Sequence, residues 1–466
     1  MTDSINTVVL AAGKGTRLKI QTPKPLCICL GRTLVDHVLE NLLDFEKEAK
    51  AKLQLGIVIG HAKEQVEASI RASFAHSNIQ FATQEEQLGT GHALKIYFEA
   101  FPSAWENKYT LISCADTPLI TKAIYHRMLK HLLDNKLDAV GASFFTEDPT
   151  GYGRIEHGNP GFSIIEEKDA NSDQKSIKEV NSGVYLMRTS YIKGHLAKLS
   201  SNNKSGEFYL TDLLKKEANV SSLVFDDAQS FLGVNDLVQL DEARSILQER
   251  TNRNHMRNGV RIINSSTVYI EQSVKIEAGA VIYPNTYIMG ESELGANTIV
   301  EPGSMIKDSL IESDVLIKAN SYFEKAHVKK FSAIGPMARL REGSQIGEGC
   351  KIGNFVETKK SVLDSGVKIS HLSYVGDAKI GENTNIGCGF ITCNYDGERK
   401  HQTIIGKNSF IGSDCQVVAP IEIGSNAYIG SGSTINKNVP DNAFAIARQR
   451  QSNKEDMAKR FLKTSK

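Results

Sequence analysis

The chain has 466 residues, of which 40% are hydrophobic and 23% charged, and its 55 lysines and arginines nearly balance its 54 aspartates and glutamates. A chain of this length is expected to form two or three domains with substantial hydrophobic cores. The net charge of +1 gives no bulk attraction to nucleic acid or membrane, and no apolar run approaches the roughly 18 residues that span a bilayer.

The cysteines and the first residues bear on where the protein works. The seven cysteines are odd in number, and Cys27 and Cys29 have neither zinc-binding spacing nor a second pair nearby. We expect these cysteines to be small, reduced core residues. The first residues also lack the charged-then-apolar pattern of a signal segment. Together these features predict a cytoplasmic protein.

The first motif in chain order is VVLAAGKGTRL, residues 8–18. Its valines and leucine favour a strand, and Gly13 and Gly15 end that strand in a loop whose backbone N–H groups no side chain obstructs. Lys14 and Arg17 add two nearby cations, so the loop suits a polyphosphate. It is not a Walker A loop, because no Gly-Lys-Ser/Thr follows at the required gap. It also lacks the dinucleotide fingerprint, because Leu18 stands where the third glycine belongs.

The first half of the chain alternates strand-like and helix-like segments. Strands are predicted within residues 53–61, 109–120 and 137–145, and a helix within 33–45, where apolar residues recur at helical spacing. This alternation predicts an α/β domain, residues 1–237, with a Rossmann-like, mostly parallel sheet and a site at the strand ends. A long helix is predicted over 236–259, and we interpret its residues 238–258 as a linker.

Residues 259–466 follow a different pattern. An aliphatic residue recurs every six positions from Ile276 to Ile306, and again from Ile405 to Ile435. Four positions after each of the first five aliphatic residues comes a small one: Ala280, Thr286, Ser292, Thr298 and Ser304. A period of six indicates short strands joined by tight turns, three to a coil, with the aliphatic residues inside a triangular prism. We therefore predict a left-handed parallel β-helix of hexapeptide repeats, followed by a basic tail, residues 453–466.

Further motifs make the first half specific. Lys24 lies nine residues after Gly15, and the pattern from Leu10 to Lys24 resembles the signature of sugar-phosphate nucleotidyltransferases. The segments that follow in that family's order are QEEQLGTGHAL (84–94), CADTPLI (114–120), DPTGYGRI (148–155), EEKDA (166–170), EVNSGVY (179–185) and GVND (233–236). With the β-helix behind them, the whole chain resembles the family of bacterial bifunctional N-acetylglucosamine-1-phosphate uridyltransferases/glucosamine-1-phosphate acetyltransferases.

For the first half, this resemblance implies that a sugar 1-phosphate attacks the α-phosphate of UTP and releases pyrophosphate. Arg17 and Lys24 are the implied catalytic cations. Asp116 and Asn235 are the implied Mg²⁺ ligands, since a carboxylate and an amide oxygen suit a hard cation. The implied contacts to uridine are Gln84, Gly89 and Thr90, and those to N-acetylglucosamine are Gly153, Glu166 and Asn181. The implied nucleotide-binding set also includes Leu10, Ala11, Ala12, Gly13, Lys24, Cys114 and Ala115.

One departure from the family concerns the residues before the implied metal aspartate. The family usually has Tyr-Gly there, whereas this chain has Cys114-Ala115. Alanine adds a methyl group where the backbone packs close to the nucleotide. We therefore expect a changed nucleotide geometry or rate, with the metal ligand itself retained.

In the β-helix, four segments break the repeat and are predicted to project as functional loops: 337–344, 353–361, 370–387 and 389–404. The resemblance implies that His371 is the general base that takes a proton from the amino group of glucosamine 1-phosphate. It implies that Arg341 and Lys359 hold the sugar phosphate, and that Tyr374 and Asn385 contact the sugar. The implied acetyl-CoA set is Cys388, Asn394, Tyr395, Ser413, Ser431 and Arg448. Cys388 and Ser431 stand where the family often has alanine.

The resemblance as a whole implies a two-step enzyme that makes UDP-N-acetylglucosamine, the precursor for peptidoglycan and lipopolysaccharide. It implies Mg²⁺ as cofactor, acetyl-CoA and UTP as co-substrates, and two sugar phosphates as further small-molecule partners. It also implies a homotrimer whose acyl-transfer sites lie between subunits, with no nucleic-acid or membrane partner. Two alternatives stay open: a sugar-phosphate nucleotidyltransferase whose β-helix is only regulatory, and a non-catalytic scaffold subunit built from the same two folds.

Overall fold

The structure is a computed structural model that describes residues 4–49 and 51–462. The chain divides into two compact units, Met1–Leu247 and Gln248–Lys466. The boundary falls inside helix α7 (Leu237–Arg257), where a single long helix was predicted. The segment 238–258, interpreted from the sequence as a separate linker, is thus divided between the two units.

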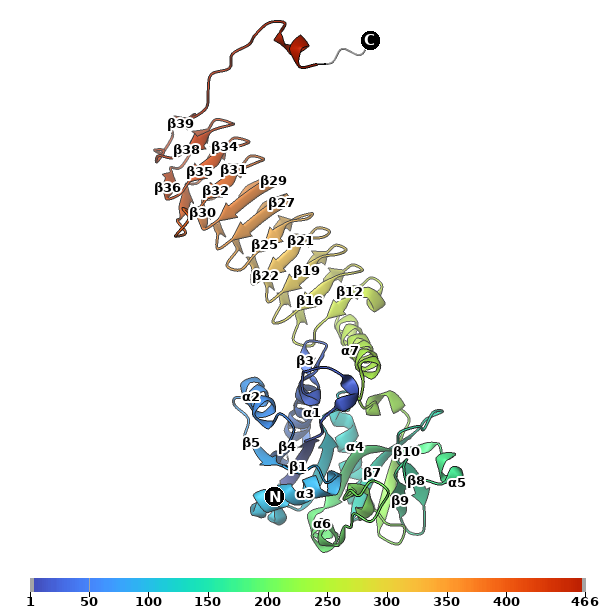
Figure 1. Cartoon of the computed structure of the whole chain (residues 1–466). Helices are drawn as coiled ribbons and strands as arrows, with labels where there is room; N and C mark the ends of the chain where they lie inside the picture. Colours follow the sequence, from blue (N-terminus) through green and yellow to red (C-terminus); the bar gives the residue numbers. More distant parts are fainter. Residues whose placement is uncertain (1–3, 50, 463–466) are drawn as a thin grey trace. The chain divides into compact units, whose positions relative to one another are not determined.

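The first unit is built on a mostly parallel sheet (Figure 1) with the strand order β11-β7-β10-β6-β1-β4-β5. Parallel pairs join β1 to β4 and β6, β4 to β5, and β7 to β11, whereas β10 is antiparallel to β6 and β7. The bounds are β1 Ser4–Ala11, β4 Lys52–Ile59, β5 Ile79–Thr83, β6 Tyr109–Cys114, β7 Ala139–Phe145, β10 Glu179–Arg188 and β11 Val220–Phe225. Beside β10 lie the antiparallel strands β8 (Arg154–His157) and β9 (Phe162–Ile165), and β2 (Ile28–Cys29) pairs separately with β3 (Arg32–Thr33).

Helices cover both faces of this sheet, because successive residues of a strand point to opposite sides. Val9 and Ile57 belong to the core that contains buried residues of α1, α2 and α4, whereas Val8 and Val58 belong to the core that contains those of α3 and α6. The helix bounds are α1 Leu34–Ala49, α2 Lys63–Ser73, α3 Thr90–Ala100, α4 Lys122–Asp134, α5 Ser172–Lys175 and α6 Thr189–His195. The predicted α/β fold is confirmed, although the strand expected within 109–120 ends at Cys114.

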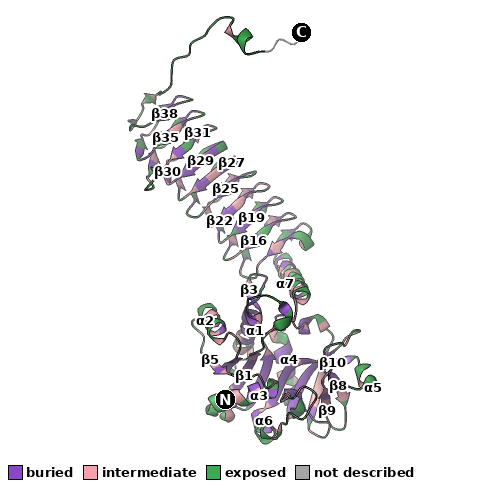
Figure 2. Ribbon diagram, in the orientation of Figure 1, coloured by how far each residue is buried: buried purple, intermediate pink, exposed green. Residues whose placement is uncertain are grey.

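The second unit is a parallel β-helix, confirming the prediction from the hexapeptide repeat (Figure 1). Its strands run from β12 (Arg261–Ile262) to β39 (Phe444–Ala445), mostly two or three residues long. Each strand pairs with the equivalent strand of the next coil, as where Ile276 stands opposite Leu294 and Leu294 opposite Ile311. The aliphatic residues are buried in the interior, and buried residues recur along the strands of the second unit in Figure 2. The five small residues predicted beside them are all 0% exposed, because only small side chains fit inside the corners.

Three of the four segments predicted to be loops instead continue the coil. Segment 337–344 contains β25 (Arg339–Leu340), segment 353–361 lies mostly in β27 (Lys351–Lys359), and segment 370–387 contains most of β29 (Lys368–Gly376) with β30 (Ala378–Ile380) and β31 (Asn385–Ile386). The loop prediction was wrong because the interior stays filled where the repeat lapses: Thr358 stands six positions after Ile352, where the repeat has an aliphatic residue, and it is 0% exposed.

Only segment 389–404 leaves the coil. Between β32 (Ile391–Cys393) and β33 (Thr403–Ile405) the chain makes an excursion closed by a bridge between Tyr395 and Lys400. The later strands β34 (Phe410–Ile411), β35 (Gln416–Val418) and β37 (Tyr428–Ile429) resume the regular coil. Of the predicted basic tail, the described residues from Asn453 on are largely exposed (Figure 2), and Lys463–Lys466 lie outside the described residues.

All seven cysteines are free thiols. Cys27, Cys29, Cys350 and Cys415 are buried, as predicted for core residues. Cys114 and Cys393 are half-buried and Cys388 is exposed, so the prediction does not hold for these three. Cys388 lies in a turn after β31, and its side chain is exposed.

Candidate active sites

The glycine-rich loop follows β1, which ends at Ala11, and leads into a short 3-10 helix at Thr16–Leu18. Nothing lies within 4 Å of the position that a side chain on Gly13 would take, so its backbone faces open space. Gly15 has φ +60, and a Cβ there would stand 2.7 Å from the Cβ of Lys24. Glycine is required at 15 because the loop must turn into the left-handed region and let Lys24 pass close to it.

Lys24 is the centre of a cluster that gathers residues from three distant parts of the first unit. Its Nζ donates to Asp116 Oδ2 at 2.5 Å and to Asn235 Oδ1 at 2.9 Å. Arg17 Nη2 donates to the same Asn235 oxygen at 2.9 Å. The structure thus brings together both predicted cations and both predicted metal ligands at the carboxyl ends of β1 and β6.

The donor set of this cluster fits a hard divalent cation. The residues in 4–49 and 51–462 contain no group of three histidine, cysteine or acidic side chains arranged to hold a metal. Asp116 and Asn235 instead offer one carboxylate and one amide oxygen, and Mg²⁺ commonly binds through one or two protein oxygens with the rest supplied by phosphate and water. These residues therefore fit Mg²⁺ accompanied by a phosphate-bearing ligand rather than a fully protein-bound metal.

A cavity of about 380 Å³ opens beside the cluster. Its lining includes eight of the residues predicted for the nucleotide: Leu10, Ala12, Gly13, Gln84, Gly89, Thr90, Cys114 and Asp116. Gln84 Nε2 donates to the carbonyl of Gly89 at 3.1 Å, which fixes the amide at the cavity wall. Gly89 has φ +107 and a Cβ there would lie 2.6 Å from the Phe208 carbonyl, so this wall needs glycine. The predicted residues Ala11 and Ala115 are buried behind the lining.

The three residues predicted to contact the sugar converge on one point. A Cβ on Gly153 would lie 3.5 Å from the Cβ of Asn181 and 3.7 Å from Glu166 Oε2. Thr211 Oγ1 donates to Glu166 Oε1 at 3.0 Å, and Asn181 Nδ2 donates to the hydroxyl of Tyr185 at 2.6 Å. Burial raises the pKa of Glu166 despite the Thr211 hydrogen bond, which lowers it. Hydrogen bonds thus hold the Glu166 carboxyl group and the Asn181 amide in fixed orientations beside Gly153.

Cys114 and Ala115, which replace the Tyr-Gly usual in the family, lie at the carboxyl end of β6. Cys114 is half-buried, with Sγ 3.7 Å from where a Cβ of Gly183 would lie, and burial raises the pKa of its thiol to about 12. Ala115 N donates to the Leu10 carbonyl at 3.0 Å. The Ala115 methyl group is packed in the core at 3% exposure, so it does not narrow the cavity.

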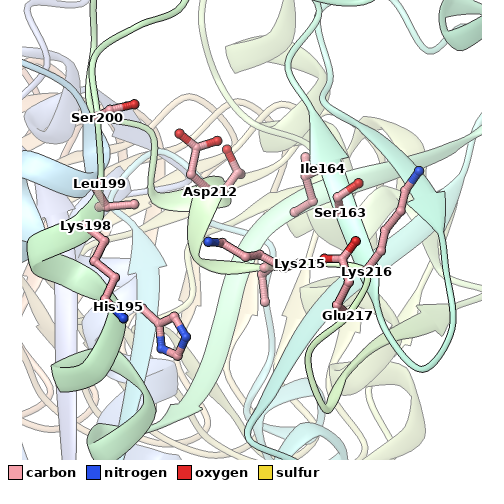
Figure 3. Close-up of a pocket in the computed structure, with 12 residues that line it drawn as sticks. Ser163, Ile164, His195, Lys198, Leu199, Ser200, Asp212, Lys215, Lys216 and Glu217 are labelled. Atoms are coloured by element: carbon pink, nitrogen blue, oxygen red, sulfur yellow. The ribbon is translucent and has the colours of Figure 1, made fainter.

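A second cavity of about 520 Å³ is lined by residues of β9 and of the segments 195–200 and 211–217 (Figure 3). Figure 3 shows His195 and Lys198 on one side of it, Asp212 and Lys215 near its middle, and Lys216 with Glu217 on the other side. Thr211 also lines it, and the same residue supports Glu166. The lining combines three lysines with two carboxylates, Asp212 and Glu217.

In the β-helix, the predicted sugar-phosphate residues occupy successive coils. Arg341 N donates to the Thr358 carbonyl at 2.9 Å, and the next residue, Lys359, stands opposite Gly376. Arg341 Nη1 also donates to Glu357 Oε1 at 2.8 Å, and Glu357 stands opposite Tyr374. Arg341, Lys359 and Tyr374 are therefore neighbours on one face of the prism.

His371 and Asn385 do not share that face. β29 bends at Leu372, whose φ is +32, and its earlier part pairs with β31 whereas its later part pairs with β32. Asn385 stands opposite Lys368 on the earlier part, while Tyr374 lies on the later part. His371 is exposed at the corner between the two faces, where its Nδ1 lies 2.9 Å from Asn354 Oδ1.

Five of the six predicted acetyl-CoA residues fall into two groups. Asn394 is 5% exposed, donates from Nδ2 to Asp377 Oδ2 at 2.5 Å and lies near Tyr374, with Tyr395 exposed on the excursion beside it. Cys388, Ser413 and Ser431 follow one corner of the prism, linked by hydrogen bonds from the next coil at Asp414 N (2.6 Å) and Gly432 N (2.8 Å). Arg448 is exposed just beyond β39.

Comparison with known proteins decides the family. A nucleotidyl transferase model matches residues 6–236, and a bacterial transferase hexapeptide model of six repeats matches residues 273–308 and 402–437. The bifunctional protein GlmU of Thermosipho africanus is 41% identical over 447 residues, 96% of this chain and 95% of its own length. That of Geotalea uraniireducens is 42% identical over 461 residues, 97% of this chain and 98% of its own. The chain belongs to the bifunctional GlmU family.

GlmU membership confirms the resemblance found in the sequence, and the alternatives of a regulatory β-helix and of a non-catalytic scaffold lose their support. The chain is a bifunctional transferase, with a nucleotidyl transferase unit and a hexapeptide transferase unit. Among solved structures, the uridine diphosphate N-acetylglucosamine pyrophosphorylase of Trypanosoma brucei overlaps 55% of this chain and 67% of its own at 14% identity, with a TM-score of 0.44. In the described part of the chain no helix combines the length and the apolar character needed to cross a membrane.

Several residues that shape the two GlmU sites were not predicted. They are Tyr185 and Thr211 beside the sugar-contact residues, Glu357 beside Arg341, Asn354 beside His371, and Asp377 beside Asn394. Tyr185 belongs to the segment EVNSGVY (179–185), but nothing in that segment marks its side chain as functional. Thr211, Glu357, Asn354 and Asp377 lie far along the chain from their partners, and only the folded chain brings each pair together. For Asn354, the coil spacing of the β-helix is the one signal that relates it to His371.

Proposed function

We propose that this chain acetylates glucosamine 1-phosphate with acetyl-CoA in its second unit and then transfers UMP from UTP to the N-acetylglucosamine 1-phosphate in its first unit. The product is UDP-N-acetylglucosamine, with pyrophosphate released. The observation that carries the proposal is the cluster of Lys24, Arg17, Asp116 and Asn235 beside the cavity, in a chain that belongs to the bifunctional GlmU family. The work of the protein is thus to supply a nucleotide sugar for peptidoglycan and lipopolysaccharide, in the cytoplasm where its co-substrates are made.

In uridylyl transfer, a phosphate oxygen of the sugar phosphate attacks the α-phosphorus of UTP, and the bond to the β-phosphate breaks. Lys24 and Arg17 exchange their hydrogen bonds to Asp116 and Asn235 for phosphate oxygens, and so stabilise the charge that develops on pyrophosphate. Asp116 and Asn235 would hold Mg²⁺, which would further neutralise the phosphate charge. Glu166 and Asn181 orient the sugar, with Gly153 leaving room for it.

In acetyl transfer, the amine of glucosamine 1-phosphate attacks the thioester carbonyl of acetyl-CoA. A C–N bond forms, the C–S bond breaks, and the proton of the amine passes to His371 before it reaches the departing thiolate. Arg341 and Lys359 bind the sugar phosphate, and Tyr374 and Asn385 the sugar. Asn394, Tyr395, Cys388, Ser413, Ser431 and Arg448 bind acetyl-CoA.

The second unit is proposed to work as a homotrimer with these sites between subunits. Met337, Phe355 and Leu372 have φ between +32 and +59, although bulky residues avoid that region, and their side chains are 46%, 56% and 60% exposed. Burial of this apolar row against another copy would offset the backbone strain. Asn385 and Tyr374 also lie on diverging faces, so one sugar reaches both kinds of contact only when two subunits contribute.

The test supplies purified protein with glucosamine 1-phosphate, acetyl-CoA, UTP and Mg²⁺ and measures UDP-N-acetylglucosamine. The wild type is expected to make it, and His371→Ala only when given N-acetylglucosamine 1-phosphate. A protein with a regulatory β-helix would never acetylate, and a scaffold would catalyse neither step. Unchanged acetylation by His371→Ala would remove His371 from the mechanism.

A further inference from the structure

His371 and Asn354 form a side-chain pair across adjacent coils of the β-helix. They stand directly opposite each other in the parallel pairing of β27 with β29, and Asn354 Oδ1 lies 2.9 Å from His371 Nδ1. An amide oxygen can only accept a hydrogen bond, so this contact requires a proton on Nδ1. In the neutral ring the other nitrogen, Nε2, is then left with a free lone pair.

The backbone around the pair keeps the two side chains in register. A Cβ on Gly353 would stand 1.8 Å from the Ser370 carbonyl oxygen, so only glycine permits the approach of the two strands just before Asn354 and His371. The residues just after them, Phe355 and Leu372, both take left-handed φ values of +59 and +32. The chain thus turns the same corner immediately after each member of the pair, which holds the amide against the ring.

We infer that Asn354 is a positioning residue for acetyl transfer: it fixes the neutral His371 ring with its proton on Nδ1, so that Nε2 faces the amine as the proton acceptor. This deepens the proposed function and rests on His371 being the base. Free neutral imidazole in water favours the opposite form, with the proton on Nε2 and no lone pair there to receive another. After proton transfer, the Nδ1–H bond to Asn354 remains and orients the charged ring for returning the proton.

The direct test reads the tautomer by NMR of protein with ¹⁵N-labelled histidine, with the His371 signals assigned by their loss in His371→Gln. In the wild type, above the pH at which the ring loses its charge, Nδ1 is expected to carry the proton. Asn354→Leu should move that proton to Nε2, and Asn354→Asp, which keeps an acceptor oxygen, should leave it on Nδ1. This arm needs no substrate, so its result is independent of whether His371 is the base.

The kinetic test measures both activities of the same variants. Asn354→Leu is expected to lower kcat for acetylation by about 10- to 100-fold, the range for losing one orienting hydrogen bond, with both KM values within about twofold of wild type. Asn354→Asp should recover most of kcat. Asn438→Leu is the matched control, because Asn438 Oδ1 also accepts one hydrogen bond in the β-helix, from Glu422 N at 3.0 Å, and its loss should leave acetylation unchanged. Uridylyl transfer should stay constant throughout.

Two results would overturn the inference. One is a wild-type ring with the proton on Nε2, which would mean that the Asn354 amide is reversed and donates to Nδ1. The other is an Asn354→Leu protein that keeps its uridylyl activity, which shows that it is folded, and that acetylates with the wild-type kcat. Retained acetylation in His371→Ala would instead reject the proposed role of His371, while the NMR result would still decide the pair.

Discussion

Replacing Lys24 by methionine should strengthen metal binding to the nucleotide-free protein while it weakens catalysis. The Lys24 ammonium occupies the two oxygens proposed for Mg²⁺, at 2.5 Å from Asp116 Oδ2 and 2.9 Å from Asn235 Oδ1. A metal ion that binds alone must therefore displace it. Methionine keeps the length of the side chain and removes both the charge and the hydrogen bonds.

The magnitude follows from the exposure of the pair. The Lys24 and Asp116 side chains are 14% and 29% exposed, between a surface ion pair worth up to about 1 kcal/mol and a buried one. We take the displaced interaction as about 1 to 1.4 kcal/mol, which corresponds to about five- to tenfold tighter metal binding. Loss of a preorganised cation at the leaving pyrophosphate should at the same time lower kcat/KM for uridylyl transfer by about 100- to 1000-fold.

The assay is a titration with Mn²⁺ in the absence of nucleotide, with free Mn²⁺ measured by electron paramagnetic resonance. Lys14→Met is the control, because Lys14 lies on the same loop with its side chain exposed to solvent, so the dissociation constant of this variant for Mn²⁺ should stay within about twofold of wild type. Acetylation by both variants should match wild type. Weaker or unchanged Mn²⁺ binding by Lys24→Met would refute the reasoning that Lys24 competes with the metal for Asp116.

Three further outcomes are expected. Burial raises the pKa of Glu166 above its usual value of 4.5. The wild-type protein should therefore lose stability as pH rises from 4.5 through the raised pKa of the folded state, whereas Glu166→Gln lacks this penalty. The Gln variant should thus be the more stable at pH 7 and equal near pH 4 in urea unfolding, and parallel pH profiles would contradict this. Phe355→Asp should give monomers by light scattering, with acetylation lost and uridylyl transfer kept; a monomer active in both would exclude a shared site. Phe323→Ala, at a side chain 0% exposed inside the β-helix, should cost about 3–5 kcal/mol of unfolding free energy, and a loss below about 1 kcal/mol would show that the interior collapses around it.

The hexapeptide repeat and the glycine-rich loop show which parts of the structure short sequence patterns can predict. Ile276 and its successors predicted the β-helix because a coil needs an inward aliphatic residue at every sixth position, a requirement that each short segment meets on its own. Gly13 and Gly15 marked the phosphate loop for a similar reason, since the φ of Gly15 and the open backbone at Gly13 are local properties. The same pattern failed at 353–361, where smaller inward residues such as Thr358 fill the coil equally well.

The sequence by itself determined the two folds, the order of the motifs and the residue types available for phosphate, metal and proton transfer. Only the tertiary structure decided which of them meet. Lys24, Asp116 and Asn235 converge because the carboxyl ends of parallel strands share one edge of the sheet, and Asn354 reaches His371 because one coil of the prism brings the chain back to the same corner. Such contacts depend on chain closure over many residues, and no local preference of the amino acids specifies them.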